Sequence, residues 1–304
     1  METVRNDPGL GELVTEAWDP AHADLDLRST SELVALMNEA DATVAAAVAR
    51  AHDALVSAID AIAHRFEAGG RIVYVGAGTS GRLALVDAVE CQSTFAISPG
   101  RVVTLLAGGT GSPAAAQEHA EDDAEAGARE VRELTVGSGD VVVGISASGR
   151  TPYVMGALEE AGRAGALTVA VVCVAGSELA RLADHDVAVV VGGELIAGST
   201  RLKAGTAQKL VLNTISTVTM VRVGKTFGNL MVDVVATNEK LRGRVRRIVG
   251  LATGEADDRV DEALRAAGGD AKVAIVSLLE GIDADSARER LARAQGVVRK
   301  ALES

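Results

Sequence analysis

The sequence predicts an α/β protein, a three-layer α/β/α sandwich whose middle layer is a five-stranded parallel sheet. Five short runs rich in β-branched residues alternate with helix-like segments through the middle of the chain. Each run is apolar throughout rather than at every second residue, which is typical of strands buried on both faces. Ala and Val supply most of the apolar residues, since the 304 residues include only three Phe, two Tyr and one Trp. We therefore expect an aliphatic core.

Residues 31–66 are expected to form the first helical region. Apolar side chains recur there every three or four residues, and neither Pro nor Gly interrupts the pattern. These side chains include Leu33, Leu36, Val44, Leu55 and Ile62. We assign residues 1–61 to an N-terminal helical arm.

The five expected strands cover residues 71–75, 101–108, 140–145, 166–174 and 186–191. The pairs Ser112-Pro113 and Thr151-Pro152 each place a capping side chain before a proline, as in the first turn of a helix. A long helix rich in Ala and Glu is therefore expected after Pro113, and another after Pro152.

The chain after the fifth strand is expected to be helical. The segment GGELIAGSTRLKAG precedes a helix that we expect to end near Val223. From Thr253 the composition shifts to Ala, Asp and Arg, in three short helix-like segments separated by Gly268-Gly269 and by residues 281–283. We predict an α/β domain over residues 62–225 and a small C-terminal helical region over residues 226–304.

Charge and composition exclude several classes of protein. The chain has 42 acidic and 30 basic residues and a formal charge of −12, which disfavours nucleic acid or anionic lipid as the main partner. The longest apolar stretch, near residues 166–175, is shorter than the about 20 residues of a membrane span. The first 13 residues lack the basic start and the apolar run of a signal peptide.

The cysteines and histidines indicate neither a disulfide framework nor a metal site. Cys91 and Cys173 have no metal-type spacing, and the five His residues are scattered. We expect a cytoplasmic protein without a membrane or nucleic-acid partner.

The loop after the first strand, residues 76–81, reads GAGTSG and matches the GxGxxG pattern of dinucleotide-binding proteins. That pattern also requires an acidic residue about 20 positions later, at the end of the second strand, to bind the ribose. Here the second strand ends in residues 107–110, AGGT, without an acid. A dinucleotide site is therefore disfavoured.

The loop after the third strand, residues 146–151, reads SASGRT and opens a helix. The hydroxyls of Ser146, Ser148 and Thr151, together with N–H groups at a helix N-terminus, can form a compact anion site. A monophosphate suits this loop, because it has neither a P-loop lysine nor a carboxylate for magnesium. The alternative is that the hydroxyls only cap a helix. A second hydroxyl-bearing loop after a neighbouring strand favours the binding site.

These loops, in RIVYVGAGTSGR and GISASGRTP, resemble the sugar isomerase (SIS) family of phosphosugar-binding domains, which have a flavodoxin-like fold. Three blocks resemble the N-acetylmuramic acid 6-phosphate etherase family more narrowly. They are GAGTSGRLALVDAVEC, GELIAGSTRLKAGTAQKLVLNTIST and GKTFGNLMVDVVATNEKL. The last two are specific to the etherases and a relative, the glucokinase regulatory protein. The resemblance extends from about Leu25 to the C-terminus.

The resemblance implies a carbon–oxygen lyase that removes the D-lactyl ether from C3 of N-acetylmuramic acid 6-phosphate. The products would be N-acetylglucosamine 6-phosphate and D-lactate, in the catabolism and recycling of cell-wall amino sugars. It implies no cofactor, and it implies a homodimer, for which the uncharged helix from Ala204 to Val223 is the candidate interface.

Two carboxylates can divide the acid and base roles of such an elimination. By resemblance, Glu90 is the acid that protonates the departing lactate oxygen, and Glu121 is the base at C2 of the sugar. The residues around Glu90 are largely apolar, which favours a protonated acid. Glu121 is expected on the long helix after Pro113, in an acidic run of the kind that usually forms a solvated face.

Further residues are expected to bind the substrate or its phosphate: Gly78, Thr79, Ser80, Ser146, Ser148, Gly149, Thr151, Arg201 and Lys203. Arg201 and Lys203 are candidates for the phosphate or the lactyl carboxylate. Their alternative interpretation is that they are exposed cations near a helix start, where the helix dipole does not favour them. Two other functions stay open at this point, a sugar-phosphate-binding regulator and an aldose–ketose phosphosugar isomerase.

Overall fold

A computed structural model describes residues 14–109, 119–234 and 238–303. The chain forms two compact units. The first comprises Met1–Ala88 and Val102–Ile215, and the second comprises Val89–Arg101 and Ser216–Ser304. The predicted domain boundaries after residues 61 and 225 stay a prediction.

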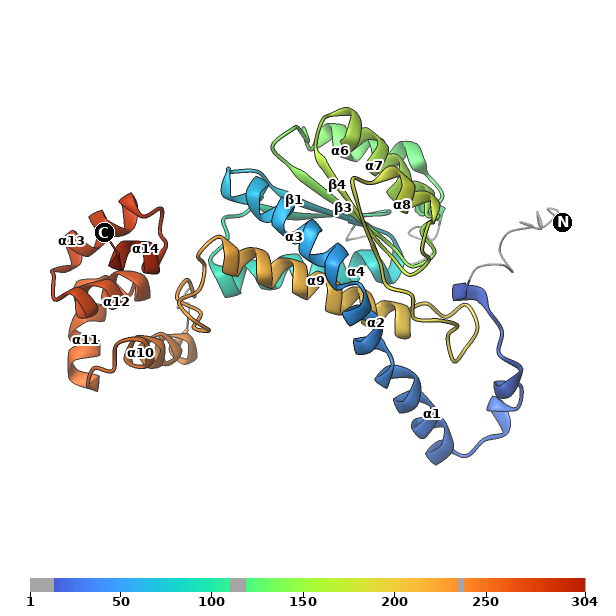
Figure 1. Cartoon of the computed structure of the whole chain (residues 1–304), viewed down its shortest axis with the longest axis horizontal. Coiled ribbons are helices and arrows are strands. Elements are labelled where there is room, and N and C mark those ends of the chain that lie inside the picture. The colour runs from blue at the N-terminus through green and yellow to red at the C-terminus, as the bar shows by residue number, and fades with distance from the viewer. Residues whose placement is uncertain (1–13, 110–118, 235–237, 304) are drawn as a thin grey trace. The chain divides into compact units, whose positions relative to one another are not determined.

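The first unit contains the predicted five-stranded parallel sheet (Figure 1). Its strands are β1 (Ile72–Gly76), β2 (Val102–Leu106), β3 (Val141–Ser146), β4 (Leu167–Val172) and β5 (His185–Ala188). Their order is β2-β1-β3-β4-β5, and every neighbouring pair is parallel. The chain passes from β1 to β2 on one side and then returns to β3 on the other side of β1. The carboxyl ends of β1 and β3 therefore flank the point where the strand order reverses, where ligands bind in open α/β sheets.

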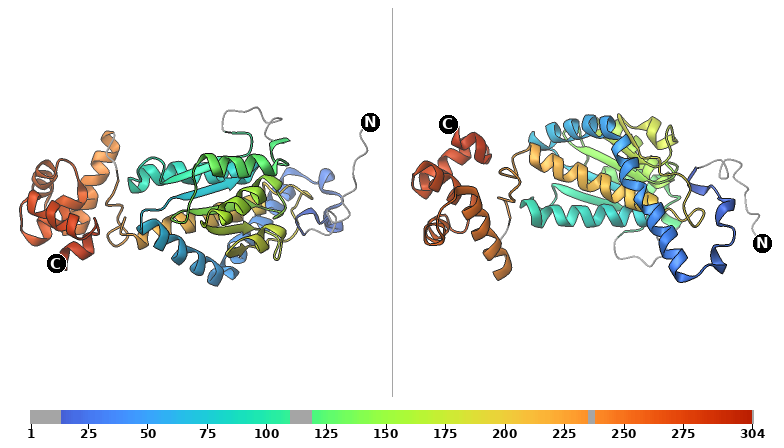
Figure 2. Two further views of the ribbon diagram at one scale, coloured as in Figure 1. Left: turned by 90° about the horizontal axis from the view of Figure 1, so that it is seen from above. Right: turned by 60° about the horizontal axis from the view of Figure 1, so that its bottom comes forward.

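Helices cover both faces of the sheet, as the sequence predicts (Figures 1 and 2). On one face lie α6 (Ala124–Glu133), α7 (Pro152–Arg163) and α8 (Glu178–Leu182). On the other face α9 (Lys203–Arg222) runs between α3 (His52–Glu67) and α4 (Gly78–Phe95). The first core lies between the sheet and α6–α8 and is largely aliphatic, with Val73, Val142, Val154 and Leu158 buried. Burial of this aliphatic surface is the main driving force for the three-layer packing.

The N-terminal region is helical but is not the continuous helix expected over residues 31–66. It forms α1 (Thr30–Ala42), α2 (Val44–Arg50) and α3, with breaks at Thr43 and Ala51. The Thr43 hydroxyl donates to the carbonyl of Ala40 at 2.7 Å, a local bond that competes with helix continuation. α1 buries none of its residues, whereas α3 buries Leu55, Ile59 and Ile62, among others.

In the described part of the chain, no single helix is long and apolar enough to cross a membrane. The two helical segments Thr30–Arg50 and His52–Glu67, which are bent by 61° relative to each other, reach the necessary length and composition only when they are taken together.

The second unit includes α10 (Glu239–Thr253), α11 (Asp257–Ala266), α12 (Ala271–Glu280), α13 (Ala284–Arg293) and α14 (Val298–Leu302). The three short helices predicted after Thr253 correspond to α11, α12 and α13, and they are separated at the predicted glycines. Gly281 has φ +66° and ends α12 in the left-handed conformation that glycine adopts without strain. Asp270 and Asp283 cap the starts of α12 and α13.

Candidate active site

The two hydroxyl-bearing loops follow neighbouring strands at the switch point of the sheet. β1 ends at Gly76 and α4 begins at Gly78, while β3 ends at Ser146 and α7 begins at Pro152. Gly76 pairs with Ile145 in the parallel register, so both loops leave the sheet at the same edge. The first loop admits no side chain at Gly81, where a Cβ would lie 2.6 Å from the Gly76 carbonyl oxygen.

The second loop is held by a network of hydroxyl groups. The Ser146 and Thr151 oxygens lie 2.8 Å apart, and Ser146 Oγ accepts the backbone N–H of Gly149 at 3.0 Å. Thr151 Oγ1 in turn donates to Glu121 Oε1 at 3.1 Å. A hydroxyl has only one proton, and an ionised carboxylate only accepts. Thr151 therefore gives its proton to Glu121, and Ser146 gives its own to Thr151.

The hydroxyl proton of Ser148 remains available to a ligand, unlike those of Ser146 and Thr151. The Ser148 oxygen accepts the N–H of Arg150 at 3.3 Å and lies 3.4 Å from Ser146 Oγ. Its side chain is half-buried, whereas Ser146 and Thr151 are buried. Of the three predicted phosphate-binding hydroxyls, the network thus leaves Ser148 free to donate, while Ser146 and Thr151 brace the loop.

Glu121 lies beside this loop, although not on the element that the sequence predicts. It lies in the turn that precedes α6, and its carbonyl accepts the N–H of Tyr153 in α7. The helix start predicted at Ser112-Pro113 lies outside the described residues. Glu121 is half-buried, while its neighbours Asp122 and Asp123 are exposed. The acidic run therefore has a solvated part, and Glu121 is not in it.

Glu90 lies on α4, in the part of that helix that belongs to the second unit. Its side chain is exposed in the single chain, so the apolar surroundings expected from its sequence neighbours are wrong for the isolated protein. One turn before Glu90, a buried aspartate holds α4 in place through hydrogen bonds. Asp87 is 4% exposed and accepts hydrogen bonds from the Tyr74 hydroxyl at 3.0 Å and from Asn213 Nδ2 at 2.6 Å.

The cations expected near the start of α9 have different environments. The Lys203 ammonium donates to the Val191 carbonyl oxygen at 2.8 Å, and the Arg201 side chain is exposed. Glu194, which is buried, accepts the backbone N–H groups of Lys203 and Ala204, each at 2.9 Å. Glu194 thus satisfies two of the free N–H groups at the start of α9 and complements the positive end of the helix dipole.

Two residues near the site, Asp87 and Gln208, were not expected from the sequence. Gln208 lies on α9, and its Oε1 accepts a hydrogen bond from Ser80 Oγ of the first loop at 2.9 Å. Both are polar residues between apolar positions of helices that pack against the sheet. A polar residue among apolar ones on a packed helix face indicates a buried hydrogen-bonded group, because a buried polar side chain requires a partner.

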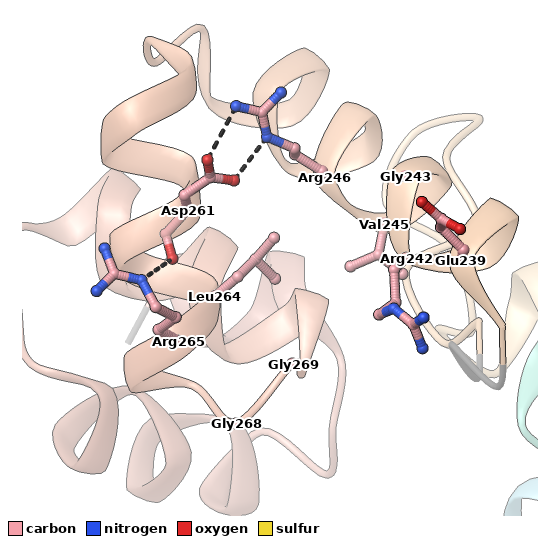
Figure 3. Close-up of a pocket in the computed structure, with 10 residues that line it drawn as sticks. All are labelled: Glu239, Arg242, Gly243, Val245, Arg246, Asp261, Leu264, Arg265, Gly268 and Gly269. Carbon is pink, nitrogen blue, oxygen red and sulfur yellow. Dashed lines mark hydrogen bonds and ion pairs between the residues drawn. The ribbon is translucent and has the colours of Figure 1, made fainter.

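A separate cavity of about 690 Å³ lies in the C-terminal helices of the second unit (Figure 3). Arg246 lines it and forms a two-point ion pair with Asp261, at 2.6 and 2.9 Å, as the dashed lines show. None of the residues predicted for catalysis or phosphate binding lines this cavity. It is therefore not the candidate active site.

Comparisons with known proteins bear on the fold and on the family of this chain. A model described as the glucokinase regulatory protein N-terminal SIS domain matches residues 54–161, and an SIS domain model matches residues 123–217. An N-acetylmuramic acid 6-phosphate etherase of Rubrobacter xylanophilus is 57% identical over 97% of this chain and 98% of its own length. An etherase of the same name from Streptomyces avermitilis is 54% identical over 96% of this chain and 94% of its own length. One from Escherichia coli is 47% identical over 97% of this chain and 99% of its own length.

Among solved structures, a phosphoheptose isomerase of Francisella tularensis has a similar fold. It is 19% identical, with a TM-score of 0.52, over 64% of this chain and all of the other. This likeness supports the SIS-type α/β fold that the strand order shows.

Proposed function

The chain belongs to the N-acetylmuramic acid 6-phosphate etherase family, and from that premise we propose how its own residues perform the reaction. The chain cleaves the D-lactyl ether at C3 of N-acetylmuramic acid 6-phosphate and yields N-acetylglucosamine 6-phosphate and D-lactate. The observation that carries the proposal is the hydrogen bond between Thr151 and Glu121. It joins a carboxylate suited to proton transfer to a loop suited to binding a phosphate.

The chemistry proceeds from the open-chain sugar. Its C1 aldehyde acidifies the proton on C2, which Glu121 removes as general base. The C3–O bond then breaks, and Glu90 donates a proton to the lactate oxygen, because an alkoxide is a poor leaving group. Water adds at C3 of the unsaturated aldehyde, and C2 regains a proton. The net change is the addition of one water molecule and the loss of one molecule of lactic acid.

The phosphate of the substrate lies at the switch point of the sheet in this proposal. Ser148 donates its hydroxyl proton to a phosphate oxygen, and Gly78, Thr79 and Ser80 contribute the first turn of α4. The N-terminus of a helix attracts an anion through its unpaired N–H groups and its dipole. We assign Arg201 to an anionic group of the substrate, since its side chain is exposed and forms no ion pair in the described structure. The Lys203 ammonium gives one of its three N–H donors to the Val191 carbonyl, so two remain for an anionic group of the substrate.

We propose that the chain works as a homodimer, in which Glu90 is covered by the second copy. The exposed apolar side chains of α9 support this arrangement, with Val218 and Val221 38% and 47% exposed. A partner that covers Glu90 would supply the low-polarity surroundings that the single chain lacks. The burial of Cys91 and Cys173 as thiols accords with the reducing cytoplasm as the place of the reaction.

The proposed reaction is tested by incubating the protein with N-acetylmuramic acid 6-phosphate and assaying D-lactate. The matched control is Glu121→Gln, which preserves the size of the side chain and its hydrogen-bond acceptor but cannot remove a proton. Lactate release by the wild type that this variant lacks would support the proposal. Binding or isomerisation of phosphosugars without lactate release would overturn it, in favour of a regulator or an isomerase.

A further inference from the structure

Gln208 has a side-chain amide that is buried and only half satisfied. The residue is 2% exposed, in the second turn of α9. Its Oε1 accepts the hydroxyl proton of Ser80 at 2.9 Å, but its Nε2 is buried without a hydrogen-bond partner. An amide nitrogen carries two N–H donors, and a buried donor that is left unpaired destabilises the folded protein. A native protein retains such a group when something else supplies the acceptor.

The unpaired nitrogen lies at the first phosphate-binding loop. Oε1 and Nε2 belong to one amide, so Nε2 lies next to the Ser80 hydroxyl that Oε1 holds. The same face of α9 approaches this loop one turn earlier, because a Cβ at Gly205 would lie 3.6 Å from Thr79 Cγ2. That distance is an ordinary van der Waals contact, so α9 packs directly against the loop there. Gln208 is the next polar group along that face.

We propose that Gln208 binds the phosphosugar directly, with Nε2 donating to an oxygen of its phosphate. This assignment rests on the proposed function for the identity of the ligand. Ser80 gives its single proton to Gln208 Oε1, so the Ser80 hydroxyl itself has no proton left for the anion. The amide nitrogen supplies the donor in its place, and the start of α4 supplies the favourable field. Gln208 therefore extends the phosphate site from the sheet loops to α9.

The test measures the affinity of the intact protein for N-acetylglucosamine 6-phosphate by calorimetry, with unphosphorylated N-acetylglucosamine as the second ligand. Gln208→Met preserves the length of the side chain and removes the donor. We expect it to weaken phosphosugar binding about 10- to 100-fold, as for a lost hydrogen bond to a charged group. Binding of the unphosphorylated sugar should change less than about threefold. A loss that is equal for both ligands would overturn the proposal.

Gln208→Glu is the second variant, because it still accepts from Ser80 but replaces the donor with an acceptor. At pH 8 it should bind the phosphosugar more weakly than Gln208→Met does. As the pH falls and the new carboxyl takes up a proton, the ratio of its dissociation constant to that of the wild type should decrease. The wild type, measured in parallel, corrects for protonation of the phosphate itself.

The matched control is Thr219→Val, which alters another buried side chain of α9 whose hydroxyl is also unpaired in the described structure. It should leave phosphosugar affinity within about twofold of the wild type. If both Gln208 variants bind the phosphosugar as the wild type does, the amide is satisfied by water alone and the proposal fails. A wild type that binds the phosphosugar but releases no lactate would instead overturn the proposed function.

Discussion

The Thr151 hydroxyl donates a hydrogen bond of 3.1 Å to the Glu121 carboxylate, and Thr151 is also the residue directly before α7, at the end of the loop of residues 146–151. Its side chain makes no capping bond to that helix. Instead its hydroxyl holds one oxygen of the Glu121 carboxylate. Loss of this hydrogen bond should therefore affect the rate of the reaction.

Thr151→Val should lower kcat with little effect on KM. The change removes the hydroxyl that orients Glu121 but preserves the shape of the side chain. We expect a loss of about 10-fold in kcat for one hydrogen bond and a KM within about threefold. Steady-state lactate release measures both constants. Thr168→Val is the matched control, because the Thr168 hydroxyl donates to Asp184 at 2.9 Å, away from either loop. An unchanged kcat for Thr151→Val would contradict the prediction.

Ser148→Ala and Ser146→Ala should have different effects. Ser148 has a proton to give to a phosphate, so its loss should weaken phosphosugar binding about 10- to 100-fold while leaving the free energy of unfolding nearly unchanged. Ser146 accepts the buried N–H of Gly149, so its loss should destabilise the fold by about 1–3 kcal/mol. Calorimetric titration and urea unfolding separate the two effects. Reversed outcomes would show that Ser146, rather than Ser148, contacts the phosphate.

Asp140 should make the stability of the sheet depend on pH. Burial raises the pKa of Asp140, but the hydrogen bonds from Arg71 and from the Gly137 N–H outweigh it, so the pKa is lowered. The Arg71–Asp140 ion pair, at 2.6 Å, joins the starts of β1 and β3. A lowered pKa contributes stability above the unfolded pKa of about 3.9, and that stability is lost as the pH falls through the folded value.

Asp140→Asn should therefore reduce the free energy of unfolding at pH 7 by about 1–3 kcal/mol. The difference from the wild type should shrink as the pH falls below about 4, since the wild-type carboxyl is then protonated. Urea unfolding between pH 3 and pH 7 measures this difference. A difference that stays constant over the range would mean that the carboxylate charge does not matter.

Val221→Asp should dissociate the proposed dimer. A charge on the exposed apolar face of α9 would be buried without a partner in the assembly. Light scattering at micromolar concentration should report a dimer for the wild type and a monomer for the variant. Leu251→Asp, at a position 62% exposed on α10, is the matched control and should remain dimeric. A fully active wild-type monomer would contradict the prediction.

The sheet and its loops were predictable because their signals are local. The continuous apolar runs specify buried parallel strands, and Pro152 after Thr151 marks the start of α7. The break of the N-terminal helix at Thr43 was not predictable from periodicity, because apolar spacing continues through it. It depends on one side-chain bond to a carbonyl.

The site was predicted less completely than the fold, because its connections are long-range. The Thr151–Glu121 bond joins residues 30 positions apart, and the Ser80–Gln208 bond joins residues 128 apart. Only the folded chain brings these groups together. The exposure of Glu90 in the single chain likewise depends on tertiary packing, which its apolar sequence neighbours do not specify.

Isotope exchange at C2 should distinguish the roles of Glu90 and Glu121. If C2 loses its proton before the C3–O bond breaks, an enolate-like intermediate forms. Glu90→Ala removes the acid, so lactate departs slowly while the C2 proton still exchanges. Glu121→Ala removes the base, so neither exchange nor lactate release proceeds. We expect each variant to lose at least about 10²–10⁴-fold in lactate release, as is typical of one acid–base group.

The experiment incubates each variant with substrate in deuterated water and measures deuterium at C2 of the recovered substrate by mass spectrometry. Asp122→Ala, an exposed neighbour in the same acidic run, controls for the loss of negative charge near Glu121. Exchange that survives in the Glu121 variant and disappears in the Glu90 variant would reverse the two roles. Loss of exchange in both would indicate that proton removal and C–O cleavage occur in one step, because a concerted elimination has no intermediate that can return a deuteron to C2.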